Sequence, residues 1–500
     1  MVIGPGLRKG SVVVPPSKSH EHRVLIANFL AGKRDHLSVK ASDNDDIKAT
    51  KRCLSALTSD SAQVVLPCGE SGSTLRFLSP VSAALGKVAV FQKEGRLSSR
   101  PNKEYHNLKP GIFSLEGNVS SQFVTGLLFA LPLLDGDSEI AFLSPLQSAG
   151  YVDMTLGVLA KAGIVVEKTK QGFRVKGRQK YGFQETTIEG DSSAAAFWYA
   201  ANALGNDISV SGVSESTCQP DKVARELMAE NPAQIDVSEC PDIFPPLSIV
   251  AAGRGKTTRF TGIGRLRLKE SDRVEAMRHV LETFGVKTAL DEKSFTVFGT
   301  DGKFKGGKFR SYSDHRIAMS IAIGATRAEG AVWLDNASCA AKSYPSFFAE
   351  FMRMDFVDDA NSKLVSLSLG SNLNDRETYL ESAIERLAAL EQTFLVGASS
   401  VIETEPVDVP EKYSSLKFLN QAVLLRSNLA PIELLKRIHA IEAKLGRVRL
   451  EKNAPRTIDI DIISYDSVKC DTEELVLPHP RAHERDFVAG PLKELGVRLK

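Results

Sequence analysis

The stretch SGSTLRFLSPVSAALG, residues 71–86, combines a hydroxyl-bearing start, an almost wholly apolar middle and a terminal glycine. Serine commonly caps a helix N-terminus and glycine commonly ends a helix, so the stretch predicts one short helix. Because its apolar residues are not confined to one face, we expect this helix to lie inside a lobe.

The same plan occurs six times within the first 330 residues. The other five copies are SKSHEHRVLIANFLAG from Ser17, SSQFVTGLLFALPLLDG from Ser120, DSSAAAFWYAANALG from Asp191, PDIFPPLSIVAAGRG from Pro241 and SDHRIAMSIAIGATRAEG from Ser313. Each helix start offers unpaired backbone N–H groups and a partial positive charge. Several such starts around one cleft, with Lys18, Arg76 and Arg316 beside them, predict a ligand with more than one anionic group.

Length and composition restrict the class of protein. The chain has 500 residues, of which 42% are hydrophobic and 25% charged, as in globular proteins of about three domains. Its net charge of +2 gives no general attraction to nucleic acid or to a membrane, so neither is an expected partner. The sequence shows no signal peptide, no run of membrane-spanning length and no CxxC pair among its six cysteines, which predicts a cytoplasmic location.

The pattern changes after residue 355. The stretch FVDDANSK, residues 356–363, is short, polar and acidic, and we expect it to be a linker. Beyond it, LVSLSL, FLNQAVLLR and RTIDIDIISY predict strands, while YLESAIERLAALEQ and the segment from Pro431 to Gly446 predict helices. Their order is typical of a small ferredoxin-like α+β domain, and a cut in the linker is expected to release an active C-terminal fragment.

Three charged clusters stand out in the first segment. They are Lys18, Ser19 and Arg23; GESGSTLR at 69–76; and RLRLKESDR at 265–273, to which SDHR at 313–316 and Lys342 add. Arginine side chains bind carboxylate and phosphate oxygens, and carboxylates set among cations can transfer protons. Alternatively, these charged residues could be solvated helix caps and surface ion pairs. Three clusters placed at buried helix starts make that interpretation less favoured.

Residues 1 to about 355 resemble 5-enolpyruvylshikimate-3-phosphate synthase. The resemblance rests on the motifs PSKSHEHR, ESGSTLRFL, SSQF, YVDMT, EGDSSAAAF, PDIFPPL, LRLKESDRV, SDHRIAM and AKSYPSFF, which occur in this order. It implies an α/β fold of two lobes and six βαβ-type units, with lobe A at about 15–190 and lobe B at about 1–14 and 191–355. It also implies transfer of the enolpyruvyl group of phosphoenolpyruvate to shikimate-3-phosphate with release of phosphate, and no cofactor.

The same resemblance assigns residues to this reaction. Asp242 would be the base and Glu270 the acid that protonates the methylene carbon, with Lys18 assisting. Shikimate-3-phosphate would be held by Lys18, Ser19, Arg23, Ser120, Ser121, Gln122, Ser148, Asp242 and Lys269. Phosphoenolpyruvate would be held by Lys18, Gly72, Arg100, Gln122, Arg273, Arg316 and Lys342. Two stretches, 46–69 and 100–120, are shorter than is usual in the family, and Glu70 stands where many relatives have Asn.

A second cluster lies near the C-terminus. In RTIDIDIISY, residues 456–465, strand alternation places Asp459 and Asp461 on one face and isoleucines on the other. Two carboxylates at this spacing can share magnesium ions that bridge a triphosphate, although an edge strand with one solvated face would show the same pattern. Nearby arginines favour phosphoryl transfer.

Residues of about 364–500 resemble 6-hydroxymethyl-7,8-dihydropterin pyrophosphokinase. The matching motifs are GSNLNDR, ETEP, FLNQAV, IEAKLGRVR, PRTIDIDI and LPHPRAHERDF. The resemblance implies transfer of diphosphate from ATP to the pterin, with two Mg²⁺ ions on Asp459 and Asp461 and with Arg447 and Arg456 as catalytic groups. The pterin would be bound by Thr404, Phe418, Asn420 and Phe487. ATP would be bound by Glu442, Arg447, Arg456, His479 and Arg485.

Together the two resemblances imply a bifunctional transferase that acts on small molecules in the shikimate pathway of aromatic amino acid biosynthesis and in folate biosynthesis. The two activities would be those of a 3-phosphoshikimate 1-carboxyvinyltransferase and a 2-amino-4-hydroxy-6-hydroxymethyldihydropteridine diphosphokinase. The alternative is that one half, more readily the shortened N-terminal one, is a degenerate binding or scaffold module.

Overall fold

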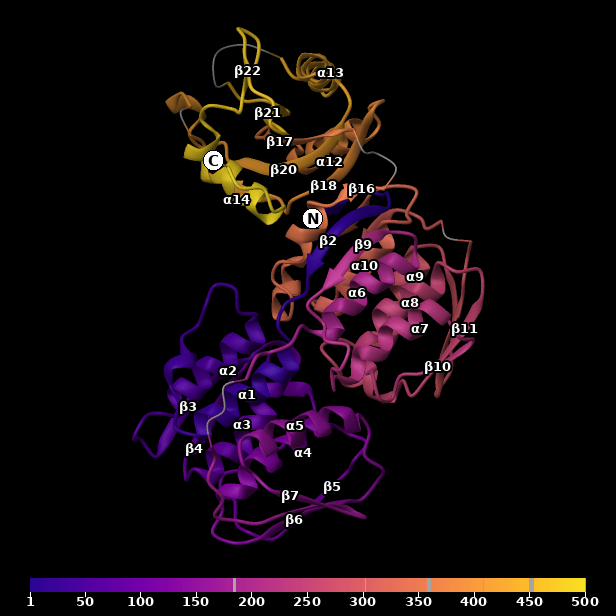
Figure 1. Ribbon diagram of the computed structural model, residues 1–500. Coiled ribbons are helices and arrows are strands. Elements are labelled where there is room, and N and C mark those ends of the chain that lie inside the picture. The colour runs from indigo at the N-terminus through magenta and orange to yellow at the C-terminus, as the bar shows by residue number, and fades with distance from the viewer. Residues whose placement is uncertain (183–185, 302, 358–360, 408, 449–453, 500) are drawn as a thin grey trace.

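The computed structural model has two helix-rich lobes and a third, sheet-centred body (Figure 1). It describes all residues except 183–185, 302, 358–360, 408, 449–453 and 500, so the middle of the expected linker lies outside the described residues. In the described part no helix is both long and apolar enough to cross a membrane.

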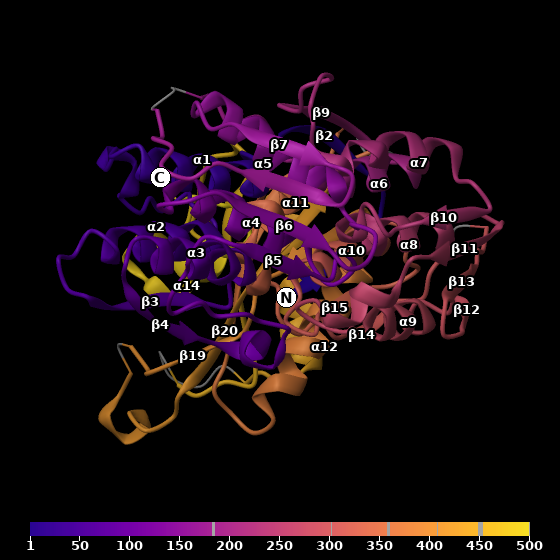
Figure 2. The ribbon, with the colours of Figure 1, turned by 90° about the horizontal axis from the view of Figure 1, so that it is seen from below.

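Lobe A is a bundle of helices with sheets on its outside. Its helices are α1 (Lys18–Leu30), α2 (Asp45–Ala56), α3 (Gly72–Ala84), α4 (Ser121–Ala130) and α5 (Ala149–Lys161). Its sheets are the parallel pair β3 (Gln63–Gly69) and β4 (Val88–Lys93), and the four-stranded sheet β5 (Ile112–Leu115), β6 (Ser138–Phe142), β8 (Gly172–Val175) and β7 (Val166–Thr169). Figure 2 shows strands β5 to β7 spread across one side of this bundle. The sheet that begins within the shortened stretch 46–69 has two strands, whereas the other sheet has four.

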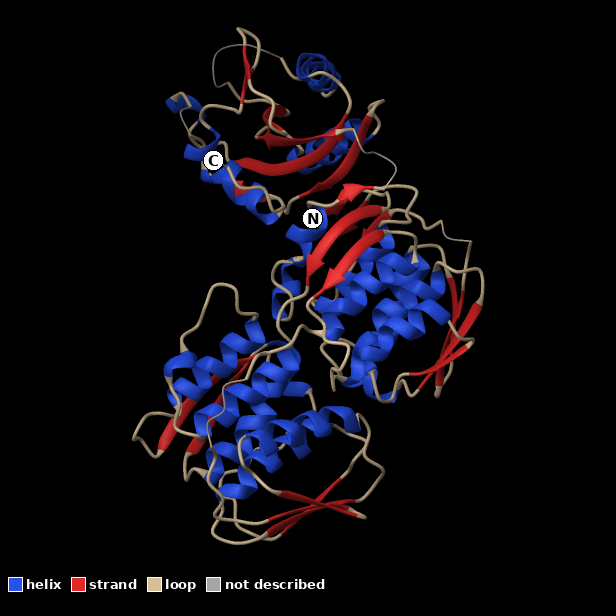
Figure 3. Ribbon diagram, in the orientation of Figure 1, coloured by secondary structure: helices blue, strands red, loops and turns tan. Residues whose placement is uncertain are grey.

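Lobe B repeats this arrangement. Its helices are α6 (Ser192–Ala203), α7 (Ala224–Glu230), α8 (Phe244–Ala252), α9 (Arg273–Thr283), α10 (His315–Ala325) and α11 (Phe347–Met352). One sheet contains β16 (Asp355–Phe356), β2 (Arg8–Val13) and β9 (Asp207–Ser211), and the other contains β10 (Gln234–Asp236), β11 (Thr257–Thr261), β13 (Ser294–Phe298) and β12 (Lys287–Leu290). The helices lie between the sheets in both lobes (Figure 3).

The chain crosses between the lobes twice, and the two crossings lie side by side. Pro16 and Gly190 form a bridge, Ser17 N donates to Glu189 O at 2.8 Å, and Asp191 N donates to Pro15 O at 2.9 Å. This paired crossing brings the starts of α1 and α6 together and places the opening between the lobes beside them.

All six predicted helices are present. Side chains of Ser17, Ser71, Ser120 and Asp191 accept hydrogen bonds from the first turns of α1, α3, α4 and α6. The last copy begins one residue later than expected, because Asp314 rather than Ser313 caps α10. In the fifth copy a 3₁₀ turn, Pro241–Ile243, precedes α8, which has no side-chain cap.

The third body contains the predicted strands and helices in the predicted order, together with further short strands and a last helix that were not predicted. Its elements are β17 (Lys363–Ser371), α12 (Arg376–Ala388), β18 (Thr393–Ala398), β19 (Ile402–Thr404), β20 (Phe418–Ser427), α13 (Pro431–Lys444), β21 (Asp459–Tyr465), β22 (Cys470–Asp471), β23 (Val476–Leu477) and α14 (Asp486–Glu494). Strand β17 lies between β20 and β21 and is antiparallel to both. The expected ferredoxin-like α+β arrangement and the two-lobed α/β fold are therefore both confirmed.

Helices α3 and α4 pack closely because Gly126 has no side chain. A Cβ atom there would lie 2.2 Å from Arg76 O and 2.9 Å from Pro80 Cγ. Backbone atoms cannot move aside as the end of a flexible side chain can, so the contact fixes how near the two helices come.

We predict that Gly126→Ala destabilises lobe A by about 1–3 kcal/mol, the usual cost of overpacking a core. Thermal unfolding followed by calorimetry measures the effect. The control is Gly157→Ala in α5, where a Cβ would have no neighbour within 4 Å and alanine favours the helix. Equal melting temperatures for the two variants would contradict this account of the packing.

Candidate functional site

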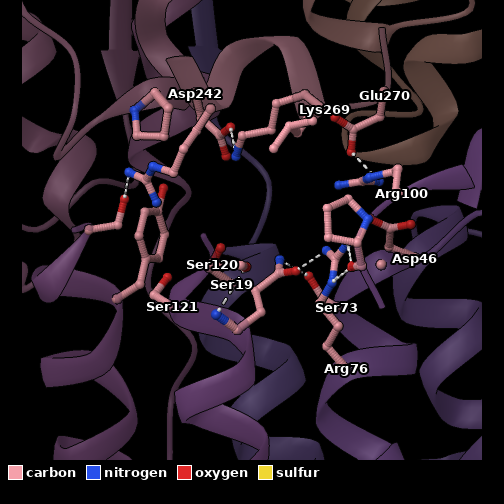
Figure 4. A pocket seen from close by; sticks show the side chains of 18 of the residues that line it. Ser19, Asp46, Ser73, Arg76, Arg100, Ser120, Ser121, Asp242, Lys269 and Glu270 are labelled. Atoms are coloured by element: carbon pink, nitrogen blue, oxygen red, sulfur yellow. Dashed lines mark hydrogen bonds and ion pairs between the residues drawn. The ribbon is translucent and has the colours of Figure 1, made fainter. Parts of the chain in front are cut away.

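A cavity between the lobes collects most of the residues expected at the first site. Its volume is about 100 Å³, and both lobes line it. The expected residues in its wall are Lys18, Ser19, Arg23, Gly72, Arg100, Ser120, Ser121, Gln122, Ser148, Asp242, Lys269, Glu270, Arg273 and Arg316. In Figure 4 Asp242, Lys269 and Glu270 face Arg76, Ser120 and Ser121 across the space. Five of the six helix starts therefore meet at this cavity, whereas the start of α6, at Asp191, is not in its wall.

The lobe B wall is centred on Asp242. Its carboxylate lies 2.8 Å from Arg273 Nη1, 3.1 Å from Arg316 Nη2 and 3.3 Å from Lys269 Nζ. Burial by itself raises the pKa of Asp242, but these three cations outweigh it and hold the pKa well below its usual value. Asp242 is therefore ionised at neutral pH and can accept a proton.

Glu270 lies beside the same arginine. Its Oε2 accepts from Arg273 Nη2 at 2.9 Å, and its Oε1 lies 3.6 Å from Arg100 Nη1 of lobe A. Burial raises the pKa of Glu270, yet Arg100, Arg273 and Lys342 together lower it well below the usual value. The neighbouring cations therefore outweigh burial and favour the ionised form of Glu270.

The lobe A wall brings two arginines, Arg76 and Arg100, close together at the cavity. Gly72 leaves room for both Arg76 and Arg100, because a Cβ there would lie 2.8 Å from Arg76 Nη1 and 3.3 Å from Arg100 Nη1. Burial, and then the charge of Arg100, lower the pKa of Arg76 to about 9. A bound anion would relieve both costs, so this wall is suited to a negatively charged ligand.

Two residues that were expected to bind substrate instead make contacts with other groups of the protein. Arg23 donates to Thr155 Oγ1, to Ser19 O and to Tyr151 O, so its guanidinium braces the wall of the cavity. Lys342 lies outside the cavity wall; its Nζ contacts both the backbone oxygen and Oε2 of Glu70 at 3.1 Å. Lys342 lines a neighbouring hollow instead.

Further residues line the cavity, among them Asp46, Tyr151, Arg265 and His315. Asp46 accepts from Lys18 Nζ at 2.9 Å, and Arg265 Nη2 donates to Ser148 Oγ at 2.7 Å. The motif RLRLKESDR contains two arginines before Lys269, and only the fold shows which of them faces the cavity. Arg265 lines it, whereas Arg267 turns outward to Asp272.

Two adjoining hollows in the third body form the second site. One has a volume of about 300 Å³ and is lined by Thr404, Phe418, Asn420, Arg447, Arg456, Asp459, Asp461, His479, Arg485 and Phe487. The other, of about 620 Å³, shares Arg447, Arg456, Asp459, Asp461 and His479 with it and adds Glu442. All residues expected at the second site are thus brought together.

The smaller hollow has an apolar and a polar side. Phe418 and Phe487 both line it, and Asn420 Nδ2 donates to Thr404 Oγ1 at 2.8 Å. Gly370 of β17 leaves the space open, because a Cβ there would lie 3.3 Å from Asn420 Oδ1. An aromatic pair beside an amide suits a flat heterocycle with polar edges.

The paired aspartates lie where the two hollows meet. Ile458, just before β21, and Ile460 and Ile462 within it are buried on the core side, which leaves Asp459 and Asp461 on the other face. Arg447 Nη1 lies 2.6 Å from Asp459 Oδ1, and Arg456 also pairs with Asp459. Burial, and then the charge of Asp459, raise the pKa of Asp461 to about 7.

These donors fit magnesium that is also held by phosphate oxygens. Among the described residues no group of three or more His, Cys, Asp or Glu side chains could hold a metal alone. Mg²⁺ commonly takes one or two carboxylates together with substrate phosphates, which matches two aspartates beside arginines. The raised pKa of Asp461 also fits a metal site, because a bound cation would favour the charged form of this carboxyl group.

Both halves of the chain match known families. Residues 103–351 match the family model for EPSP synthase (3-phosphoshikimate 1-carboxyvinyltransferase), and residues 366–497 match the model for 7,8-dihydro-6-hydroxymethylpterin-pyrophosphokinase (HPPK).

Curated relatives and solved structures agree with the first match. The 3-phosphoshikimate 1-carboxyvinyltransferase of Clostridium acetobutylicum is 36% identical over 414 residues, covering 70% of this chain and 96% of that protein. The enzyme of the same name from Clostridium kluyveri is 35% identical over 409 residues, with the same coverage of both proteins. A solved EPSP synthase from Acinetobacter baumannii has a TM-score of 0.55 at 22% identity and covers 69% of this chain and 96% of its own, which shows a common fold. The chain therefore belongs, over its first 350 or so residues, to the EPSP synthase family, and it carries an HPPK domain after them.

Proposed function

We propose that this chain is a bifunctional transferase. Its N-terminal part transfers the enolpyruvyl group of phosphoenolpyruvate to shikimate-3-phosphate, and its C-terminal part transfers diphosphate from ATP to 6-hydroxymethyl-7,8-dihydropterin. The main support is that each of the two cavities gathers a set of cations and carboxylates suited to its reaction. The catalytic parts are residues 1–355, as lobes A and B, and 364–500, joined by 356–363.

In the first site the lobes must separate to admit substrates. The cavity of about 100 Å³ is well below the roughly 300–1,000 Å³ of usual ligand pockets. Contacts such as Glu239 Oε1 with Ser148 N and Oε2 with Ala149 N, each at 2.9 Å, hold the lobes together. Ligand binding would therefore replace contacts between the lobes, and closure would then exclude water.

The carboxyl groups of Asp242 and Glu270 would carry out the proton transfers of this reaction. Asp242 is ionised and would take the proton of the attacking hydroxyl of shikimate-3-phosphate. Glu270 can deliver a proton only after its pKa rises. A phosphoenolpyruvate anion bound to Arg100 and Arg273 would draw these cations away from Glu270, so substrate binding itself would prepare the acid. Lys18, freed from Asp46, would assist at the same anion.

In the second site the protein positions charge. Asp459 and Asp461 would hold two Mg²⁺ ions, which when bound offset the charge of the transferring phosphate groups. Arg447 and Arg456, now paired with Asp459, would turn to the phosphate oxygens. Phe418 and Phe487 would stack on the pterin, Asn420 and Thr404 would bind its edge, and Glu442, His479 and Arg485 would complete the ATP side.

The alternative, a degenerate N-terminal half, is less well supported. The shortened stretches affect the two-stranded sheet β3–β4 and the region before α4, whereas the cavity keeps its cations and both acids. We also propose a reducing compartment, the cytoplasm, since all six cysteines are free.

We predict that Arg316→Ala weakens phosphoenolpyruvate binding about ten- to hundredfold, the usual worth of a charged hydrogen bond, while shikimate-3-phosphate binding alone changes little. Calorimetric titration of each ligand measures this, and Arg278→Ala, on an exposed face of α9, is the control. Equal losses for both ligands would place Arg316 elsewhere.

Glu270→Gln should lower kcat by about a hundredfold or more, because it removes proton transfer, while the protein still binds shikimate-3-phosphate. Phosphate release and a binding titration on one preparation measure both quantities. Glu275→Gln, which alters a half-buried carboxylate of α9 outside the cavity wall, should behave as wild type. Full turnover by folded Glu270→Gln protein would rule out the acid.

Asp461→Asn should abolish pyrophosphokinase activity and leave enolpyruvyl transfer unchanged, because the change removes one metal-binding carboxylate. A chelator should have the same selective effect on the wild-type protein. Both activities are assayed side by side, with Asp471→Asn in the exposed strand β22 as the control. Loss of the shikimate reaction in chelator would refute the cofactor-free assignment, and pterin activity in Asp461→Asn would refute the metal assignment.

A further inference from the structure

One sheet runs through lobe B and the third body. Its strand order is β14 (Gly307–Phe309), β15 (Val332–Leu334), β1 (Val2–Ile3), β18, β20, β17 and β21, with β19 also on β20. Strand β1 is antiparallel to both neighbours: Val2 pairs with Trp333 and Ala398, and Ile3 pairs with Val332 and Gly397. Two residues at the N-terminal end thus join the two parts through backbone hydrogen bonds.

The side chains of β1 also divide between two cores. Val2, 1% exposed, packs in the core of the third body, with Val365, Leu395 and Ile460 among its members. Ile3, fully buried, packs in the core of lobe B. That lobe B core also takes in Val396, Leu424, Val488 and Leu492 of the third body, so the apolar interior is continuous across the boundary.

The backbones approach too closely for side chains at this boundary. Gly4 N donates to Val396 O at 3.0 Å, and a Cβ on Gly4 would lie 1.7 Å from Leu395 O. A Cβ on Gly397 would lie 2.7 Å from Val2 O and 2.6 Å from Met352 Sδ. Glycine on both sides of the contact indicates strands matched to each other rather than two domains that happen to touch.

A buried arginine supports the same junction. Arg8 is fully buried; its Nη2 donates to Gly4 O at 2.9 Å and to Val396 O at 3.2 Å, and its guanidinium lies 4.0 Å from the centre of the Phe356 ring. On the other side Arg426 of β20 donates to Ser362 O at 3.2 Å and pairs with Asp355 of β16. Asp355, in the segment before residues 358–360, is thereby paired with a residue of the third body, while Arg8 reaches from lobe B to the backbone of Val396.

We propose that β1 is a structural strand of both catalytic parts, so that the pyrophosphokinase domain is docked permanently on lobe B and depends on residues 1–4 for its stability. Without β1, strand β18 would be an open edge and the gap left by Val2 would open the core. Domains joined only by a linker usually meet through smaller and more polar surfaces. The proposal replaces the expectation that a cut at 356–363 frees an independent enzyme.

The test uses the full chain and a substitution more than 300 residues away from the second site. Gly4→Val should force β1 off β18 and lower the temperature at which pyrophosphokinase activity is half lost by about 5 °C or more, as a loss of a few kcal/mol would do. Gly330→Ala, just before β15 and with no neighbour within 4 Å of its Cβ, is the control and should leave this temperature unchanged. An unchanged pyrophosphokinase temperature in Gly4→Val protein would overturn the proposal.

A second measurement holds even if Gly4→Val fails to fold. A protease site inserted within residues 358–360 of the full chain is cut after purification, and the product is run on a sizing column without denaturant. The two pieces should elute together with both activities retained. Elution as two separate, active pieces would overturn the proposal. This outcome does not depend on which substrates the two sites use.

Discussion

The buried guanidinium of Arg273 is the interaction on which the first site depends. It contacts Asp314 Oδ2 at 2.9 Å, Asp242 Oδ1 at 2.8 Å and Glu270 Oε2 at 2.9 Å, with only 1% of its side chain exposed. Asp314 in turn caps α10 and so fixes the position of Arg316. One arginine thus sets the distance between the proposed base and the proposed acid. Because a buried charge is stable only when paired, loss of the Arg273 guanidinium would leave three buried carboxylates without this partner.

The same pairing explains how the empty and filled cavity can differ. Without ligands, the acids of lobe B are paired with cations, and Lys18 and Lys342 of the opposite lobes are held by Asp46 and Glu70. In the proposed function, anionic substrates would compete for these cations. The carboxylates would then lose their partners, and their pKa values would move toward those that proton transfer needs. The substrates themselves would thus prepare the site for chemistry, which would limit side reactions in their absence.

The second site has the opposite arrangement, since its carboxylates lack sufficient cations. Asp461, with its raised pKa, lies beside Asp459, and the nearby arginines are shared with Asp459 and Glu442. A metal–triphosphate complex would supply positive charge to the aspartates and negative charge to the arginines at once. Its scaffold, β17 with β20 and β21, is the far end of the sheet that passes through β1 into lobe B. The rigid element under this site is thereby shared with the other enzyme.

The sequence by itself determined the local elements and most of the chemistry. Of the residues assigned to the two sites from the sequence, all but Lys342 line the cavities. Caps and glycines marked the six helices, and alternation separated Asp459 and Asp461 from the buried isoleucines. These are short-range properties, set by helix ends and strand pleats. Only the tertiary structure decided which cation meets which acid: Arg267 turns away while Arg265 turns inward, Lys342 pairs with Glu70, and Glu270 is ionised rather than protonated. The tertiary structure alone also decided that Val2 and Ile3 complete a sheet with residues nearly 400 positions away. Such pairing depends on how whole bodies pack, and a two-residue strand is too short to show a sequence pattern that predicts it.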